Sequence, residues 1–359
     1  MTTYLLAGGG TAGHVNPLLA VADRLLERHP DATVLVLGTK EGLESRLVPE
    51  RGYELLTIDR VPFPRRPNGA ALRFPSRFRG TISAVRRILR ERQVDVVVGF
   101  GGYVSAPAYL AARAERVPFA IHEANVRAGI ANRLGARFTG FVGTAFPGTR
   151  IRGGRPVGMP LRREIEQLDR FEGRREGIRL FGLDDTKPTL LVTGGSSGAQ
   201  RINDTVSQSI TLILGAGWQV IHVTGAYRDA LEDPQLSGYL VLKYLDRMDL
   251  ALAVTDLAVA RAGTATVAEL CALGVPAVFV PYAVGNGEQR FNARGPVDAG
   301  GAVMVDDAAF TPAWVASDLV PLLRNRARIA DMAARIATVG VLDGTDRMVD
   351  LVDSAARVK

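Results

Sequence analysis

The chain has 359 residues, 47% of them hydrophobic, and carries a formal net charge of +7. This length is typical of two domains, and the apolar content argues against a disordered chain. A single cysteine, Cys271, excludes a disulfide framework and favours a cytoplasmic compartment. The chain starts directly with a predicted strand, which argues against a signal peptide.

The first half begins with a strand, a glycine turn and a helix in direct succession. A predicted strand over Thr3–Ala7 runs into the turn Gly8–Gly13, and a helical pattern follows over residues 15–26. Such a turn gathers backbone N–H groups at a helix N-terminus, where a phosphate is favoured. We expect the other strands of this half over residues 33–38, 53–58, 94–99, 119–122 and 140–143.

A basic segment follows the third predicted strand. Ten arginines lie between Arg60 and Arg92, opposed only by Glu91, and apolar side chains are interspersed among them. Arginines beside apolar side chains suit an anionic membrane surface, whereas a nucleic-acid signature is absent. The alternative is a solvated helix with one core-facing side. The predicted membrane-facing residues are Leu72, Arg73, Phe74, Arg77 and Phe78.

The uncharged stretch from Val96 to Ala112 is not predicted to span a membrane. It contains three glycines and a proline and is shorter than the ~20 apolar residues that a bilayer helix needs. We divide it into a strand, a second glycine turn over residues 99–105 and a helix. The fifth strand then ends in His122, Glu123 and Asn125, which we expect on the same polar rim as the turns.

The second half repeats this succession of strand, glycine turn and helix. Residues 147–186, rich in Arg and Gly, look like a connection, and a strand over Thr189–Thr193 then enters the turn 194–200 and a helical pattern over 201–214. We therefore predict an α/β protein with two doubly wound, mainly parallel sheets whose glycine turns face a cleft. The further strands are expected over residues 219–223, 239–243, 257–260, 277–280 and 302–305.

Two segments near the C-terminal turns contain candidate ligand-binding residues. Thr266 and Glu269 have the spacing of a capping box, but the same turn could offer N–H groups to a diphosphate and a carboxylate to sugar hydroxyls. Both interpretations stay open. We expect residues 285–292 to form a second polar loop.

Three common kinds of site find no support in the sequence. The pattern Gly8-x-Gly10-x-x-Gly13 fits a dinucleotide fingerprint, but the next strand lacks the acidic residue that would bind the ribose. No Asp-x-Asp pair occurs, and the four histidines show no i, i+4 pairing. We therefore predict no metal site and no cofactor.

The motifs taken together resemble the MurG family of peptidoglycan N-acetylglucosaminyltransferases, most closely its actinobacterial members. The resemblance extends from Thr3 to about residue 330, although Ser197 stands where the family usually has Gln. It implies a GT-B fold with an acceptor domain over residues 1–158, a donor domain over 159–340, and a C-terminal helix over 341–359 that packs back on the first domain. The motifs are Gly8–His14, Gly99–Ser105, His122–Asn125, Gly194–Ala199, Arg261–Glu269 and residues 286–290.

The family implies inverting transfer of N-acetylglucosamine from UDP-N-acetylglucosamine to the muramyl 4-hydroxyl of lipid I. The chain would act as a peripheral protein on the cytoplasmic face of the membrane, with other cell-wall synthesis proteins as potential partners. Another MurG-like transferase, a UDP-N-acetylglucosamine 2-epimerase and a non-catalytic basic protein are the alternatives.

The resemblance also assigns the site residues. His14 is the candidate base, and Asn16–Pro17 beside it is expected to cap the helix and favour the neutral imidazole. A purely structural role for His14 remains the alternative. The acceptor or its diphosphate would face Gly10, Gly101, Gly102, Tyr103, His122 and Glu123. The donor would contact Thr11, Ala12, Gly13, Asn125, Arg162, Ser196, Leu245, Thr264, Ala265, Thr266, Val267, Ala268, Glu269 and Gln289.

Overall fold

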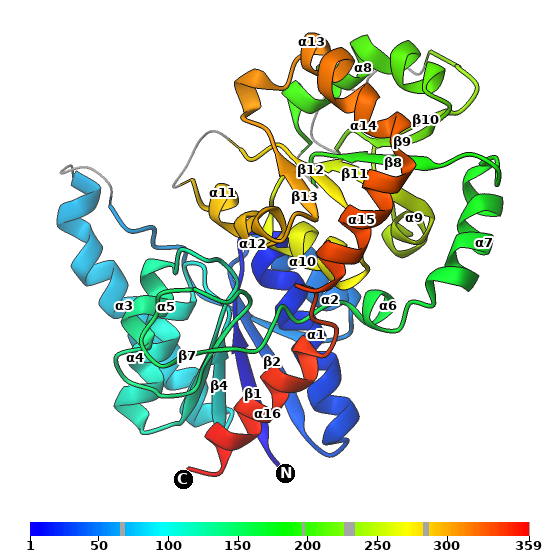
Figure 1. The fold of residues 1–359 in the computed structure, drawn as a ribbon. Helices are drawn as coiled ribbons and strands as arrows, with labels where there is room; N and C mark the ends of the chain where they lie inside the picture. Colours follow the sequence, from blue (N-terminus) through cyan, green and yellow to red (C-terminus); the bar gives the residue numbers. More distant parts are fainter. Residues whose placement is uncertain (65–68, 196–197, 226–233, 283–286, 359) are drawn as a thin grey trace. The chain divides into compact units, whose positions relative to one another are not determined.

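The computed structural model describes residues 1–358 except 65–68, 196–197, 226–233 and 283–286. The chain forms two compact units (Figure 1). The first unit comprises Met1–Arg162 and Leu342–Lys359, and the second comprises Arg163–Val341. The first unit is therefore built from both ends of the sequence.

Within its described residues, the first unit contains a parallel sheet of seven strands in the order β3-β2-β1-β4-β5-β6-β7. The order reverses between β1 and β4, where Ala7 pairs with Gly99. This switch point brings the first two glycine turns together at the carboxyl edge of the sheet. The strands are β1 Thr3–Ala7, β2 Thr33–Gly38, β3 Glu54–Thr57, β4 Val96–Gly99, β5 Phe119–Glu123, β6 Val142–Thr144 and β7 Gly154–Pro156.

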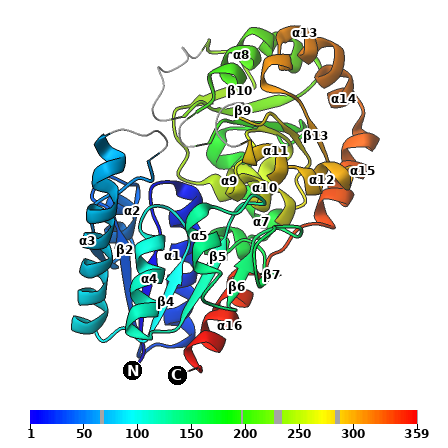
Figure 2. The same cartoon turned by 90° about the vertical axis from the view of Figure 1, so that its left-hand side faces the viewer.

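Helices cover both faces of this sheet, because successive strand residues point to opposite sides. Leu6 packs in one core with α1 and α16, whereas Leu5 and Ala7 pack in another with α3 and α4. The adjacent helices α3 and α4 are seen together in Figure 2. The helices are α1 Ala12–Arg28, α2 Glu44–Glu50, α3 Gly69–Glu91, α4 Ser105–Glu115, α5 Ile130–Gly135 and α16 Gly344–Ala356.

The second unit has a parallel sheet of six strands among its described residues, in the order β10-β9-β8-β11-β12-β13. The strands are β8 Thr189–Thr193, β9 Gln219–Val223, β10 Tyr239–Leu242, β11 Thr255–Ala260, β12 Ala277–Phe279 and β13 Ala302–Met304.

The helices α8 and α14 pack in one core with the strands of the second sheet, while α9 contacts β8 and α7 contacts α9. A 3₁₀ turn spans Asp307–Ala309 and a π-helical segment spans Val315–Leu319. The helices are α6 Arg163–Glu166, α7 Arg170–Phe181, α8 Gln200–Gly215, α9 Met248–Val254, α10 Thr264–Ala272, α11 Glu288–Asn292, α12 Arg294–Asp298, α13 Pro312–Trp314, α14 Val320–Arg324 and α15 Arg326–Ala337.

The segment predicted as a connection, residues 147–186, has structure of its own. It contributes β7 to the first sheet and both α6 and α7 to the second unit. All three residues of β7 are exposed, so the sequence offers no alternation of apolar side chains to indicate a strand. An edge strand of this length is specified by its backbone pairing with β6.

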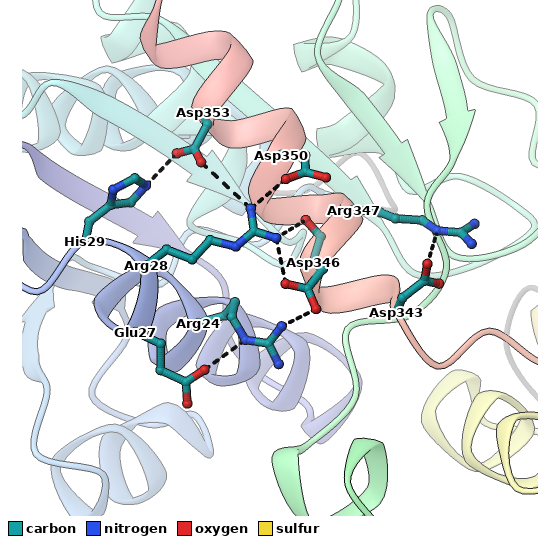
Figure 3. Close-up of polar contacts among 9 residues, drawn as sticks. All are labelled: Arg24, Glu27, Arg28, His29, Asp343, Asp346, Arg347, Asp350 and Asp353. Carbon is teal, nitrogen blue, oxygen red and sulfur yellow. Dashed lines mark hydrogen bonds and ion pairs between the residues drawn. The ribbon is translucent and has the colours of Figure 1, made fainter.

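The C-terminal helix α16 packs on α1 within the first unit. Met348 and Val352 of α16 are buried in the same core as Leu18 and Val21 of α1. Figure 3 shows the polar contacts between the two helices. Arg24 and Arg28 of α1 bind Asp346, Arg28 also binds Asp350, and His29 Nε2 lies 3.0 Å from Asp353.

Among the described residues, no helix combines the length and apolar character needed to cross a bilayer. The uncharged stretch from Val96 to Ala112 forms β4, a glycine turn and the start of α4. Its predicted division into strand, turn and helix is therefore confirmed.

Candidate active site

The first glycine turn leads directly into α1. The helix begins at Ala12 after an extended Thr11, and Pro17 lies inside it. The prediction that Asn16 and Pro17 start the helix is therefore wrong, because the turn itself already places the chain in helical conformation. His14 consequently sits within the first helical turn, close to the dipole's positive end.

The ring of His14 is held by backbone oxygen. Its Nδ1 lies 3.1 Å from the Gly9 carbonyl oxygen and 3.3 Å from the Thr11 hydroxyl. A carbonyl oxygen can only accept, so Nδ1 carries the proton in the neutral ring and Nε2 keeps its lone pair. A Cβ on Gly101 would lie 3.1 Å from Nε2, and the φ of +95° at Gly101 also favours glycine.

The surroundings of His14 favour its neutral form. Burial lowers the pKa of His14 below its ordinary value, opposed by the hydrogen bond to Gly9 and by attraction from Glu123 and Glu44. The imidazole is only partly exposed. At neutral pH it can therefore accept a proton at Nε2.

Glu44, which the sequence did not single out, lies beneath the first glycine turn. Its carboxylate is 1% exposed and accepts hydrogen bonds from Gly10 N–H at 2.8 Å, Thr39 N–H at 2.9 Å and the Thr39 hydroxyl at 2.8 Å. A Cβ on Gly9 or Gly42 would come within 2.3 Å of its oxygens. The carboxylate thus fills the space that these two glycines leave open.

The second glycine turn closes over the first. A Cβ on Gly102 would lie 2.7 Å from the Gly9 carbonyl oxygen, and the Ser105 hydroxyl lies 3.0 Å from both Gly101 N and the Ala7 carbonyl oxygen. Together the turns border a small cavity of about 70 Å³. Its lining residues are Gly9, Gly10, Thr39, Glu41, Gly42, Glu44, Arg60, Tyr103 and Val104.

Two of the residues expected to face the acceptor, Gly10 and Tyr103, line this cavity. The Arg60 guanidinium lies over the Tyr103 ring at 4.8 Å from its centroid. No carboxylate of the described residues forms an ion pair with Arg60. A cation therefore stands at this cavity beside an aromatic face.

His122 and Glu123 were expected on the polar rim, but both are buried. His122 Nε2 bonds the Gly158 carbonyl at 3.1 Å, and burial lowers the pKa of His122 to about 4. The Glu123 carboxylate accepts from Asn125 N–H, Gly129 N–H and the Asn132 amide, each at 2.9 Å. These two side chains therefore shape the loop that carries Asn125 instead of facing a ligand.

In the second unit, α10 begins where β11 ends. Its N-cap is Gly263 in extended conformation, with no side-chain cap and no acidic residue in the first turn. Thr266 lies inside the helix, so the predicted capping box is wrong. The first N–H groups of α10, starting at Thr264, lack intrahelical acceptors and stand at the carboxyl edge of the sheet.

The side chains of α10 divide between core and surface. Thr264 and Val267 are buried, whereas Ala265, Thr266, Ala268 and Glu269 are partly exposed. Val267 can therefore offer a ligand little beyond its backbone. Glu269 is on the exposed side, as a sugar-hydroxyl ligand would have to be.

Neighbouring loops are tied to the same edge. Arg261 is buried and donates to the Val280 carbonyl at 2.9 Å and to Asp307 at 2.5 Å. The Gln289 side-chain oxygen accepts from Tyr282 N–H at 2.9 Å, which leaves its NH₂ group as the donor for a ligand.

The structure gives only the position in the fold for some of the remaining predicted residues, and others lie outside the described residues. Leu245, partly exposed, follows β10 at the same edge of the second sheet. Arg162 is the last residue of the first unit's N-terminal segment. Ser196 and Ser197 lie outside the described residues. Among the described residues, no group of three or more His, Cys, Asp or Glu side chains could hold a metal ion.

Comparison with known proteins accounts for both units. The glycosyltransferase family 28 N-terminal domain matches residues 4–143, and the family's C-terminal domain matches residues 189–348. A crystal structure of MurG from Acinetobacter baumannii is similar, with a TM-score of 0.80 and 28% identity, covering 99% of this chain and all of that one.

Curated relatives match over the full length. The chain is 62% identical to a protein of Leifsonia xyli subsp. xyli over 98% of both chains, and 48% identical to one of Streptomyces coelicolor over 98% and 97%. Both are named UDP-N-acetylglucosamine--N-acetylmuramyl-(pentapeptide) pyrophosphoryl-undecaprenol N-acetylglucosamine transferase. A UDP-GlcNAc 2-epimerase from Neisseria meningitidis, 14% identical with a TM-score of 0.68, shares the fold alone.

Two doubly wound parallel sheets with glycine turns at their carboxyl edges, matched by these domains, define a glycosyltransferase of the GT-B fold. Within that class, the chain belongs to glycosyltransferase family 28. The predicted fold and the family resemblance are confirmed.

Proposed function

We propose that the protein transfers N-acetylglucosamine from UDP-N-acetylglucosamine to the muramyl sugar of lipid I, giving lipid II. The observation that carries this proposal is the 62% identity to the Leifsonia transferase over 98% of both chains. The geometry of His14 and α10 supports it, because the reaction needs a proton acceptor and a binding site for a leaving diphosphate.

His14 is the general base in this proposal. Its Nε2 takes the proton of the muramyl 4-hydroxyl while that oxygen attacks the anomeric carbon of the donor. The bond from the anomeric carbon to the UDP oxygen breaks in the same step, so the α-linked sugar becomes β-linked. Gly101 leaves room beside Nε2, and the Gly9 carbonyl keeps the opposite nitrogen protonated.

The second unit holds the donor in this proposal. The uncapped N-terminus of α10 offers N–H groups to the diphosphate, and their charge stabilisation grows as UDP leaves. Glu269 accepts hydrogen bonds from the ribose hydroxyls, and Gln289 donates its NH₂ group to the sugar. Leu245 contributes backbone contacts to the uracil, and Ser196 is a further donor contact. From the first unit, Arg162 also contacts the donor.

A direct assay tests the activity. Purified protein is incubated with UDP-N-acetylglucosamine and a lipid I analogue, and we expect a disaccharide product with a β-1,4 linkage. The rate should be the same with EDTA, because helix N–H groups take the place of a metal in this mechanism. Epimerised UDP-sugar in place of disaccharide would show that the proposal is wrong and that the epimerase alternative holds.

We also propose that the start of α3, together with Phe63, binds the membrane. Leu72 is 85% exposed, and Phe63, which the sequence did not single out, is 61% exposed. The Phe74 ring contacts both Phe63 and Phe78, with centroids 5.3 and 5.2 Å apart. This apolar group suits insertion into the interface of a bilayer.

The arginines of α3 differ along the helix. Arg86 and Arg90 bind Glu115, and Arg92, the residue after the helix, binds Glu54, so the charge near the end of α3 is largely compensated. No carboxylate of the described residues pairs with Arg73 or Arg77. The uncompensated charge therefore lies beside the apolar group, where it can meet anionic headgroups.

Liposome sedimentation tests this surface. Binding should rise with phosphatidylglycerol content and fall with salt, since each basic residue near the surface contributes about 1 kcal/mol. Exchanging Arg73 and Arg77 for Glu, or Leu72 and Phe63 for Ser, should each weaken binding. Exchanging the exposed Arg152 and Arg155 for Glu is the matched control for net charge. Equal loss in that control would place the surface elsewhere.

A further inference from the structure

We infer that Glu44 is a positioning residue for the base, acting on His14 through the single peptide group that joins Gly9 and Gly10. This inference rests on the proposed role of His14 in the transfer reaction. It assigns to a buried carboxylate, 30 residues from His14 in the sequence, the task of fixing the ring's tautomer and strengthening the base.

The geometry of the peptide group carries the inference. Its N–H, on Gly10, donates to Glu44 Oε2 at 2.8 Å, and its carbonyl, on Gly9, accepts from His14 Nδ1–H at 3.1 Å. The two hydrogen bonds use opposite ends of one planar, polarisable group. A carboxylate on the N–H end increases the negative charge on the carbonyl oxygen, so hydrogen bonds in such a chain strengthen one another.

The carboxylate is built into this place. Its other oxygen is held by the N–H and hydroxyl of Thr39, and the absence of side chains at Gly9 and Gly42 makes room for it. The carboxylate accepts charge-assisted hydrogen bonds from three donors and is almost excluded from water. Glu44 therefore stays fixed relative to the turn. A surface carboxylate would offer no such constraint.

The arrangement has a clear consequence for proton transfer. When Nε2 takes the hydroxyl proton, the ring becomes a cation, and its Nδ1–H bond to the Gly9 carbonyl strengthens. The charge of Glu44 stabilises this cation through the peptide group, while no proton moves to Glu44. The other ionisable groups facing His14 are Glu123, whose charge also favours the cation, and His122, which burial keeps neutral near pH 7.

Glu44→Gln tests the relay with nearly unchanged shape. Its amide oxygen can still accept from Thr39, but its NH₂ group then meets the Gly10 N–H, so the bond to the peptide group is lost. We expect kcat to fall about tenfold with donor KM nearly unchanged. The acidic limb of the pH–kcat profile should move to lower pH, because the cation loses its stabilisation.

Nitrogen-15 NMR of His14 in the free protein gives a readout independent of activity. The natural protein should show the Nδ1–H tautomer, and Glu44→Gln should show a mixture of tautomers. Thr39→Val is the matched control, since it removes a donor to the same carboxylate but leaves the Gly10 bond; its tautomer and pH limb should stay unchanged. If Glu44→Gln does not fold, Glu44→Asp provides the same comparison, because its side chain is one methylene shorter and loses the contact with Gly10 N–H.

The inference would be overturned if a folded Glu44 variant kept the His14 tautomer and the acidic limb of the pH–kcat profile of the natural protein, whatever its kcat. Failure of the natural protein to form disaccharide would instead contradict the proposed function. In that case the tautomer measurement would still decide whether Glu44 orients His14.

Discussion

The helices α1 and α10 begin in the same way, after a parallel strand and a glycine-containing turn, and neither has a capping side chain or an acidic residue in its first turn. They differ in what the preceding turn contacts. The turn before α1 contacts the chain's own anion and is compensated by it, because Gly10 N–H donates to the Glu44 carboxylate. Among the described residues, no carboxylate accepts from a backbone N–H of the turn before α10, so that turn and the helix start are left open for an external anion.

The difference shows that a glycine turn before a helix does not by itself indicate a phosphate site. The turn offers N–H groups, and residues distant in the sequence decide whether those groups are already used. In this protein we assign the compensated turn to a base and the open one to a leaving diphosphate.

The largest effect is expected at the compensated turn. His14→Ala should lower kcat at least about 10²-fold with little change in donor KM, as the loss of a general base would. Steady-state kinetics with the lipid I analogue measure this. His29→Ala, at the far end of α1, is the control and should keep its turnover. Near-normal turnover in His14→Ala would assign His14 a structural role only.

A single substitution at the N-cap of α10 can occupy the N–H groups that we assign to the diphosphate. Gly263 has φ −64° and ψ 150°, and a Cβ there would meet only Thr266 Oγ1 at 3.9 Å, so other residues fit. Gly263→Asp should raise donor KM about tenfold, because its carboxylate would occupy the N–H groups and repel the diphosphate.

Gly263→Asn separates the two causes in this experiment. It caps the helix without a charge and should raise donor KM less than Gly263→Asp does. Both variants should be as stable as the natural protein or a few tenths of a kcal/mol more stable in thermal unfolding. An unchanged KM in both variants would place the diphosphate elsewhere.

A smaller effect is expected at Glu269. Glu269→Gln removes the charge from a hydrogen bond to ribose, so donor KM should rise several-fold, on the order of 1 kcal/mol. Because glutamine keeps the shape of the side chain and its capacity to accept a hydrogen bond, the melting temperature should change little. Glu172→Gln, on the exposed side of α7, serves as the control. A drop in stability without a change in KM would indicate a structural role.

The smallest effect concerns the support of α1. Asp346→Asn removes the acceptor shared by Arg24 and Arg28 (Figure 3) and should lower the free energy of unfolding by about 1 kcal/mol, with turnover unchanged. Asp343→Asn loses only a contact with Arg347, four residues further along the chain, and should lower the free energy of unfolding by less.

The Asp346 contribution should depend on pH with a definite sign. Hydrogen bonds from Arg24 and then Arg28 lower the pKa of Asp346 in the folded state. Its stabilisation is therefore complete above the ordinary pKa of an aspartate and is lost as the pH falls through the lowered value. Chemical denaturation from pH 7 to acid should show the natural protein and Asp346→Asn converging. A constant difference would contradict the assignment.

The sequence predicted the strands well because buried parallel strands are short apolar runs that end in turn residues. The strand predicted over Gln219–Val223 has the same bounds in the structure, and that over 94–99 starts two residues late, at Val96. The sequence also predicted that the first two glycine turns lie together, because the carboxyl ends of parallel strands meet at one edge of the sheet. The β7 strand was missed because its residues are exposed and depend on β6.

Errors at the site arose where backbone groups decide the outcome. Asn16 and Thr266 have good capping side chains, but the preceding glycine turns start both helices earlier. Glu123 looked like a rim residue, although backbone N–H groups of its own loop enclose it. Glu44 could not be found, because its partner at Gly10 is 34 residues away and is a backbone group of no particular residue type.

The position of α16 has a consequence for how the chain folds as it is made. Residues such as Met348 and Val352 complete the core around α1, yet they follow the whole second unit in the sequence. The second unit, continuous from Arg163 to Val341, is therefore synthesised before them. The N-terminal residues keep part of their apolar surface uncovered until the second unit has been made.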